Sequence, residues 1–317
     1  MSLTVVRAML DAYTVMDAPP PPLTYRGPYG RLLTRSDIEF AREPGDHTGT
    51  LVSTEGTAPV PLEVRPVVPP RWRDVPHKPD RRAVTLPTWL DPTDGRLGVH
   101  ADVPMRLYLQ MEQDLGVRLP GEGDVAPRYH SQVDTPDDHH VVLVATTSQP
   151  KIKDYGPHRL LEVARELRAK TGRELHFTLL TNDQQLAEEL RPSDLSMRVA
   201  VGVDAADCVD LFGGAALVVG NDTGLTHLAA LTVRPDGTGP QVLGLYNMFS
   251  PLKWVTGSPR HHTLSTAFAS QLAIADVDIC ATSFAADIEP ALWGERADLG
   301  SIPPGNVAGF AAEVMSW

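Results

Sequence analysis

The chain has 317 residues, of which 42% are apolar, so it can bury the cores of about two domains and is not an intrinsically disordered protein. Lys and Arg number 28 against 40 Asp and Glu, and the formal net charge of −12 argues against a protein that wraps a nucleic-acid polymer or coats an anionic membrane. Only five of the cations are lysines, so each lysine is a candidate for binding a single anionic ligand.

The cysteines and the distribution of apolar residues exclude further classes. Cys208 and Cys280 are the only cysteines, which rules out a disulfide framework and a structural zinc site. We expect two buried free thiols, with a single disulfide between them as the alternative. Arg7 and Asp11 interrupt the first 16 residues, and no stretch reaches the roughly 18 apolar residues of a membrane span. We therefore expect a soluble, cytoplasmic protein without a transmembrane segment.

The first part of the chain is rich in proline. Residues 1–140 contain 19 of the 29 prolines, which favours short elements and long ordered loops because proline lacks a backbone donor. One helix is predicted over 105–115, where apolar residues recur at helical spacing and Gly116 follows. We place a domain boundary near residue 135, which gives domains at 1–135 and 136–317.

The second part alternates between strands and helices. The apolar run 141–145 is typical of a strand covered on both faces, and helical spacing follows over 157–170. Further strands are predicted at 175–180, 197–201, 217–219 and 242–246, and further helices at 184–190, 205–212 and 226–231. This alternation predicts an α/β domain with a Rossmann-like, doubly wound parallel sheet.

Ligands of such a sheet bind where strands give way to helices, so the junction residues are candidates. After the 217–219 strand, Asp222, Thr223 and Gly224 precede a helix that carries His227 one turn further on. The unpaired N–H groups at the start of that helix could bind a phosphate. The alternative is that Asp222 or Thr223 only caps the helix and that His227 is a half-buried structural residue.

Two more junctions carry polar groups. Thr146 and Thr147 follow the 141–145 strand, and Lys151 and Lys153 come shortly after, a combination suited to a diphosphate or, alternatively, a solvated loop. After the 175–180 strand, the segment 181–183 places Asn182 beside a carboxylate that could bind ribose hydroxyls or cap the next helix.

These residues resemble a known family. Asn221-Asp222-Thr223-Gly224-Leu225-Thr226-His227-Leu228-Ala229-Ala230, followed by a strand, Pro251 and Trp254, is similar to the signature of the heptosyltransferases of glycosyltransferase family 9. The segments Ala145-Thr146-Thr147 and Lys153-Asp154-Tyr155-Gly156 resemble a second motif of that family. The resemblance covers about residues 100–317.

The resemblance implies a GT-B architecture with two Rossmann-like domains, the C-terminal one holding a nucleotide-sugar donor. By position, Asp222, Thr223, Gly224 and His227 would contact the sugar and diphosphate of the donor. Thr146, Thr147 and Lys153 would bind the phosphates, and Lys151 is the alternative to Lys153 because the loop length leaves the alignment open. Such enzymes invert the anomeric carbon without a fixed metal or cofactor, and the implied co-substrate is a nucleotide sugar such as ADP-heptose.

The acceptor half departs from the family pattern. Family members open with a strand and a glycine–aspartate turn whose aspartate acts as base, and Val5 to Asp11 matches this opening with Leu10 at the glycine position. Asp11 is therefore the candidate base by resemblance, and Asp17, Asp46 and His47 are alternatives. We expect a diverged acceptor-side domain, whose acceptor is a small specialised metabolite or a cell-envelope glycan.

Several other patterns are expected to have ordinary structural roles. Asp276-Val277-Asp278 has the form of a metal-binding DxD motif but is expected to lie in an edge strand or turn, and the pairs 139–140 and 261–262 are expected to be surface or strand-entry histidines rather than metal ligands. Trp254 could line the donor pocket. The expected function is an inverting glycosyltransferase. The alternatives are a nucleotide-sugar epimerase or hydrolase of the same architecture and a binding protein without turnover.

Overall fold

The computed structural model describes residues 2–20, 29–40, 51–53, 83–85, 125–190, 194–247, 249–275 and 294–317, together with residues 23, 25, 102, 104, 105, 108, 112, 118–120 and 192. The chain divides into two compact units, Met1–Pro127 and Arg128–Trp317, whereas the predicted boundary lay a few residues later, at 135. Among the described residues, no helix is long and apolar enough to cross a membrane.

The first unit begins with helix α1 (Ser2–Val15), followed by the short helix α2 (Gly30–Leu33). The strands β1 (Leu51–Ser53) and β2 (Ala83–Thr85) pair in parallel. Thr4, Ala8 and Ala12 repeat every four residues along α1 and are buried, as expected for the inner stripe of a helix. The segment Val5 to Asp11, which the resemblance aligned with an opening strand, is therefore helical, because this spacing suits a helix.

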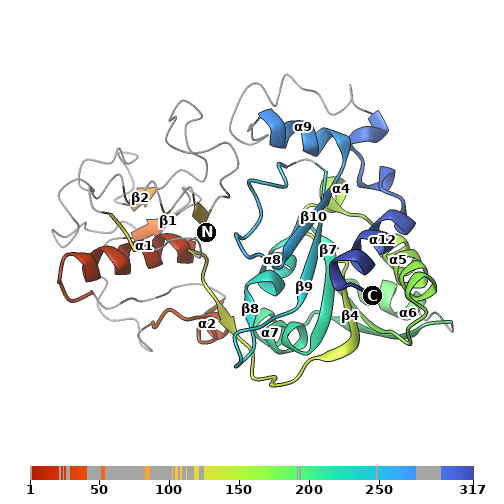
Figure 1. The fold of residues 1–317 in the computed structure, drawn as a ribbon, viewed down its shortest axis with the longest axis horizontal. Helices are drawn as coiled ribbons and strands as arrows, with labels where there is room; N and C mark the ends of the chain where they lie inside the picture. Colours follow the sequence, from red (N-terminus) through yellow and green to blue (C-terminus); the bar gives the residue numbers. More distant parts are fainter. Residues whose placement is uncertain are drawn as a thin grey trace. The chain divides into compact units, whose positions relative to one another are not determined.

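The second unit contains a six-stranded sheet in which every pairing is parallel, and its spatial order is β10-β9-β7-β4-β5-β6 (Figure 1). Its strands are β4 (Asp137–Val144), β5 (His176–Thr181), β6 (Ser196–Val201), β7 (Ala215–Asn221), β9 (Gln241–Tyr246) and β10 (His261–Ser265). Numbered by sequence within the sheet, this is the 3-2-1-4-5-6 order of a dinucleotide-binding fold. The predicted α/β class and Rossmann-like parallel sheet are confirmed.

Helices cover both faces of this sheet, with α5, α6 and α12 on one side and α7 and α8 on the other (Figure 1). Their bounds are α5 (Pro157–Thr171), α6 (Gln184–Glu189), α7 (Ala205–Gly213), α8 (Gly224–Leu231) and α12 (Pro304–Met315). Gly172 ends α5 in the left-handed conformation, which glycine adopts at little cost.

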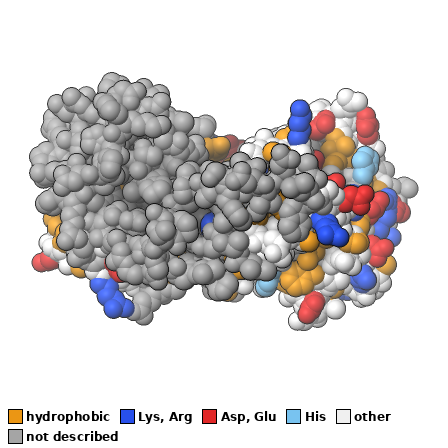
Figure 2. Space-filling model, turned by 90° about the horizontal axis from the view of Figure 1, so that it is seen from above, with side chains coloured by type: hydrophobic (Ala, Val, Ile, Leu, Met, Phe, Trp, Pro, Cys, Tyr) orange, Lys and Arg blue, Asp and Glu red, His pale blue; other side chains and the backbone are white. Residues whose placement is uncertain are grey.

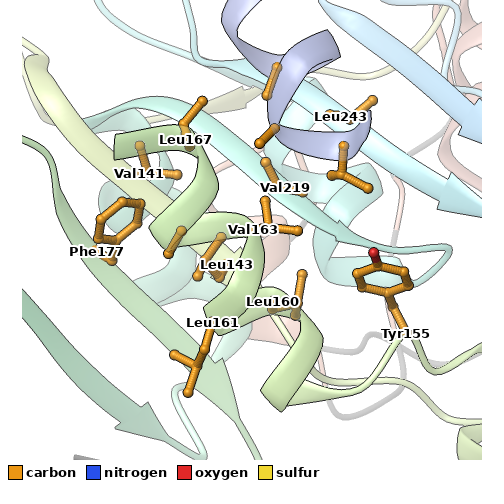
Figure 3. Packing of buried hydrophobic residues seen from close by; sticks show 14 of the residues in the cluster. Val141, Leu143, Tyr155, Leu160, Leu161, Val163, Leu167, Phe177, Val219 and Leu243 are labelled. Carbon is orange, nitrogen blue, oxygen red and sulfur yellow. The ribbon is translucent and has the colours of Figure 1, made fainter. Parts of the chain in front are cut away.

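Alternate residues of the central strands supply the main apolar core. Val141 and Leu143 of β4 and Val219 of β7 point toward the inner faces of α5 and α12, where Leu160 and Leu167 are fully buried (Figure 3). Burial on both faces explains why these strands are continuous apolar runs. The rigid sheet that results fixes the positions of the loops at its carboxyl ends.

Several elements differ from the sequence-based predictions. The lysine segment, for which a solvated loop was the alternative to a diphosphate site, contains the short helix α4 (Pro150–Lys153), which begins at a proline suited to a first helical turn. The strand β10 and the two-stranded pair of β3 (Tyr129–His130) and β8 (Thr232–Val233) were not predicted, because they are short or half-polar. In the predicted 105–115 helix, the described residues 105, 108 and 112 are helical.

Helix α9 (Ala267–Ala275) follows β10, and two 3₁₀ turns, η2 (Gly294–Ala297) and η3 (Leu299–Ser301), precede α12.

Candidate functional site

The candidate site lies at the carboxyl ends of β4 and β7, the neighbouring central strands. The chain leaves β4 toward one edge of the sheet and returns through β7 toward the other, so their connections diverge at this point. Such a switch point leaves a crevice that ligands occupy in open α/β sheets. The two motifs predicted to bind the donor follow these two strands.

Asp222 is the centre of the site. Its Oδ2 lies 2.7 Å from the Lys153 ammonium and its Oδ1 3.2 Å from His227 Nε2, while only 6% of its side chain is exposed. Burial by itself would raise the pKa of the Asp222 carboxyl, but the hydrogen bond and charge of His227 and the charge of Lys153 outweigh it, so this pKa is lowered. Asp222 therefore pairs with an amine through one carboxylate oxygen and with an imidazole through the other.

Neither Asp222 nor Thr223 caps helix α8 through its side chain, so the helix-cap alternative is wrong. Thr223 occupies the N-cap position of α8, but its side chain makes no capping hydrogen bond, and the carboxylate of Asp222 is turned to Lys153 and His227. The first turn of α8 thus has no side-chain cap, which leaves backbone donors for an anion.

Two glycines shape this helix start. A Cβ at Gly224 would meet nothing within 4 Å, so the backbone there is open to a ligand. A Cβ at Gly220 would lie 2.6 Å from Val144 Cβ and 2.5 Å from Thr226 Oγ1, so the end of β7 packs tightly against β4 and α8. This tight packing fixes the position of the first turn of α8 relative to the sheet.

Lys153 is held over the site by its surroundings. Its ammonium lies 3.9 Å from the centre of the Phe249 ring, a cation–π contact, and its side chain is 17% exposed. The fully buried Asn221 accepts a hydrogen bond from the Tyr155 amide at 2.9 Å and donates to Asp154 Oδ1 at 3.1 Å. The Asn247 side chain donates to the Ile152 carbonyl. These contacts fasten the segment after β4 to the ends of β7 and β9.

The other predicted donor-binding residues lie around this centre in different ways. Thr146 is buried directly after β4, and the half-buried Thr147 accepts a hydrogen bond from the Gln149 amide at 3.1 Å. Lys151 is exposed, unlike Lys153, so the two lysines that the alignment left open differ in their surroundings.

The third junction follows β5, and its polar residues have other surroundings than those after β4 and β7. Asn182 is exposed, and its neighbour Asp183 caps α6 by accepting from the Leu186 amide at 3.1 Å. Of the two predicted roles of this carboxylate, ribose binding and helix capping, Asp183 therefore has the helix-capping one.

Three residues behind His227 were missed by the sequence reasoning. The Tyr246 hydroxyl lies 3.3 Å from His227 Nε2 and 3.3 Å from His261 Nε2, and the Thr256 amide donates to His261 Nδ1 at 3.3 Å. Tyr246 and His261 are buried. The polar pair at 261–262 was the available signal, but only the β9–β10 pairing brings it to the site.

Two of the candidate bases, Asp11 and Asp17, lie in α1 or just after it. Asp11 stands within that helix, where its carboxylate accepts a hydrogen bond from the Tyr108 hydroxyl at 2.6 Å. Asp17 follows the helix with a positive φ of 51° and is exposed. Asp46 and His47 lie outside the described residues.

The two histidine pairs and the DxD motif, which were not expected to bind a metal, differ in where they lie. His261 begins β10 and is buried, as a strand-entry histidine, whereas His140 is buried inside β4 beside Thr178 rather than on the surface. Asp276 and Asp278 lie outside the described residues. No group of three or more His, Cys, Asp or Glu in the described part of the chain could hold a metal ion.

Cys208 is a buried free thiol, as predicted, and burial raises its pKa to about 12. The disulfide alternative is thereby wrong, while Cys280 lies outside the described residues. The predicted role of Trp254 stays a prediction; its ring packs edge-on against Phe249 with the centroids 6.0 Å apart.

The ion pairs described at the switch point join Asp222 to Lys153 and to His227. On the face of the molecule shown in Figure 2, the Lys and Arg side chains of the described residues are interspersed with Asp and Glu. A small anion at the switch point would therefore meet Lys153, the α8 amides and His227. This arrangement suits one phosphorylated ligand better than a polymeric anion.

The family comparison matches the part of the chain that builds this site. The sequence model of glycosyltransferase family 9 (heptosyltransferase) matches residues 112–273, which is more than half of the chain. No curated protein matches the chain in sequence.

Solved glycosyltransferases are among the structures with a detectable likeness. An Escherichia coli heptosyltransferase WaaC with ADP has 20% identity and a TM-score of 0.39, over 56% of this chain and 55% of that one. A family 9 glycosyltransferase from Veillonella parvula DSM 2008 has 15% identity and a TM-score of 0.48, over 72% and 62%. The iron-containing dodecameric glycosyltransferase TibC from enterotoxigenic E. coli H10407 has 14% identity and a TM-score of 0.44, over 76% and 61%. The chain thus spans less than two thirds of the length of each.

Proposed function

The chain belongs to glycosyltransferase family 9, and on this premise we propose that it transfers a sugar from a nucleoside diphosphate to a hydroxyl or amine of an acceptor, with inversion at the anomeric carbon. We propose heptose as the sugar and ADP-heptose as the donor, in keeping with the family's description. The acceptor is proposed to be a small metabolite or a cell-envelope glycan.

One observation carries the proposal. Lys153, from the segment after β4, and His227, from the helix after β7, meet on the two oxygens of Asp222 at the uncapped start of α8. A cation, an imidazole and free backbone amides at one switch point are the groups that a diphosphate requires. Thr146 and Thr147 add hydroxyls to the same edge of the sheet.

The residues of this site suit the departure of a diphosphate. In the proposed step, the acceptor oxygen or nitrogen forms a bond to the anomeric carbon while the bond from that carbon to the diphosphate oxygen breaks. Negative charge then grows on the diphosphate, and donors and cations fixed beforehand stabilise it most in the transition state. Lys153 and the α8 amides supply this charge, and Asp222 keeps Lys153 and His227 in place.

The acceptor must also lose a proton. We propose that a carboxylate of the N-terminal unit takes it, with Asp11 as the candidate, because an inverting displacement needs one base within hydrogen-bond reach of the attacking atom. Its present partner, Tyr108, would have to share the carboxylate with the acceptor.

The test is to incubate the purified protein with ADP-heptose and a panel of hydroxyl and amine acceptors and to follow products by mass spectrometry. We expect a glycosylated acceptor and free ADP, and the same products when EDTA is present. Acceptor-independent conversion of the donor would indicate an epimerase or hydrolase instead, and tight binding without conversion would indicate a binding protein. The variant Asp222→Ala is the control and should lower turnover or donor affinity by about tenfold or more, equivalent to about 1.4 kcal/mol.

A further inference from the structure

The loop that follows β9 brings an aromatic ring to the ammonium of Lys153. The centre of the Phe249 ring lies 3.9 Å from Lys153 Nζ, a distance at which the negative face of a ring attracts a cation. Phe249 is only 9% exposed, so most of its surface is packed against protein. The two residues lie far apart in the sequence, and the contact is therefore created by the fold alone.

The ring is itself supported by its neighbours. Trp254 packs against Phe249 with the centroids 6.0 Å apart and the rings at 77°, the edge-to-face arrangement that aromatic pairs favour. In the same loop, the side chain of Asn247 donates to the carbonyl of Ile152, the residue before Lys153. The loop after β9 thus contacts the lysine segment twice, once through its backbone and once through the ammonium.

The ring and the carboxylate act on the ammonium in different ways. Lys153 has three N–H donors, and one of them donates to Asp222 Oδ2 at 2.7 Å. Asp222 brings a negative charge, part of which is also shared with His227. The face of Phe249 attracts the ammonium but carries no net charge, so it restrains the cation without neutralising it. With 17% of its side chain exposed, Lys153 still reaches solvent at the site.

We propose that Phe249 is a positioning residue that holds the Lys153 ammonium in place for a phosphate through the negative face of its ring. A mobile lysine loses rotamer freedom when it binds an anion, and this loss lowers the affinity. A ring that restrains the ammonium beforehand reduces the loss and excludes water from one side of the cation. The inference rests on the proposed function only for the ligand, a nucleoside diphosphate, since the restraint itself is a property of the free protein.

Ring electrostatics and ring bulk can be separated by fluorination. Fluorine atoms withdraw electrons from the face of a phenyl ring and weaken its attraction for a cation, while they change the size of the ring little. Monofluorophenylalanine and trifluorophenylalanine at position 249, introduced by stop-codon suppression, therefore form a graded series. Phe249→Leu keeps an apolar side chain and removes the ring altogether.

NMR relaxation of protein with ¹³C-labelled lysine, free of ligand, measures the restraint directly. The chain has five lysines, so at most five side chains give signals, and Lys153→Arg assigns the one concerned. We expect a higher order parameter at Cε of Lys153 than at Cε of the exposed Lys151. The Lys153 value should decrease through the fluorinated series and be lowest in Phe249→Leu. A wild-type Lys153 as mobile as Lys151, or an unchanged value with trifluorophenylalanine, overturns the proposal.

Calorimetric titration with ADP measures the consequence for binding. Trifluorophenylalanine at position 249 should weaken ADP binding about threefold and Phe249→Leu about tenfold. Trifluorophenylalanine in place of Phe212, a fully buried ring of α7, is the matched control and should change neither ADP affinity nor the mobility of Lys153. Unchanged ADP affinity with trifluorophenylalanine at position 249 would also overturn the proposal. Wild-type protein that does not bind ADP would contradict the proposed function, while the relaxation data still decide whether the ring holds Lys153.

Discussion

At the scale of single residues, the two lysines of α4 show how position decides chemistry. They are two residues apart, yet Lys153 is paired with Asp222 and lies over Phe249, while Lys151 is exposed. An ammonium held in place loses little freedom when an anion arrives, whereas an exposed lysine must be ordered first. We therefore propose that Lys153, rather than Lys151, binds the phosphate.

This assignment predicts that Lys153→Ala weakens ADP binding by at least about tenfold, while Lys151→Ala changes it by less than about twofold. Calorimetric titration of both variants and of the wild type measures the difference. Equal losses in both variants would show that the charge of the segment, rather than the position of Lys153, binds the phosphate.

Gly224 allows a second test at this scale. Because a Cβ there meets no protein atom within 4 Å, Gly224→Ala should leave the free energy of unfolding unchanged within about 0.5 kcal/mol. The same methyl group would stand where a phosphate approaches the α8 amides, so ADP affinity should fall by about tenfold. Urea unfolding and titration with ADP separate the two effects, and a variant that binds ADP as wild type does would place the phosphate elsewhere.

At the scale of elements, the fastening of the α4 segment decides whether Lys153 can serve the site. Asn221 ends β7 and joins Tyr155 and Asp154 through its side chain, so the strand that precedes Asp222 also holds the segment that carries Lys153. The two halves of the site are thereby coupled through one buried amide.

Asn221→Ala should consequently destabilise the C-terminal unit by about 2 kcal/mol, since it removes one buried and one partly buried hydrogen bond of about 1 kcal/mol each. It should also weaken ADP binding, because Lys153 loses its support. Asn306→Ala, at an exposed position in α12, is the matched control and should change neither property. Unfolding in urea and ADP titration are the measurements, and wild-type behaviour of Asn221→Ala would mean that α4 is held by other contacts.

At the scale of the whole molecule, buried histidines link stability to pH. Burial, with the charges of His176 and Arg198 beside it, lowers the pKa of His140 to about 4, and Asp137 only partly offsets this. The ring stacks on His176 with the centroids 4.8 Å apart. Between about pH 6.5 and 4 the unfolded chain binds a proton at this position and the folded chain does not, so stability decreases as the pH falls.

Lowering the pH from 7.5 to 5.0 should therefore cost about 2 kcal/mol through His140 alone. The buried His261, with its pKa lowered to about 3, acts in the same direction. Urea midpoints at both pH values should differ less in His140→Gln than in wild type, while the exposed His158→Gln should behave as wild type. An unchanged pH dependence in His140→Gln would show that other groups carry the effect.

The sequence by itself determined the alternation of strands and helices after residue 136 and the junctions where ligands bind, because buried parallel strands and amphipathic helices have distinct spacings. It also brought Asp222, His227 and the α4 lysines to attention through their place after strands. It did not reveal that the first residues form helix α1, since a stripe of Thr4, Ala8 and Ala12 is weakly apolar.

Only the tertiary structure decided which of these residues meet. The strand order that sets β4 beside β7 brings Lys153 to Asp222 across 69 residues, and the β9–β10 pairing brings His261 to Tyr246. Neither contact leaves a local pattern, because the spacing of residues along a chain reports the faces of single elements and not their neighbours. The choice of Lys153 over Lys151, and the residues behind His227, follow from that packing alone.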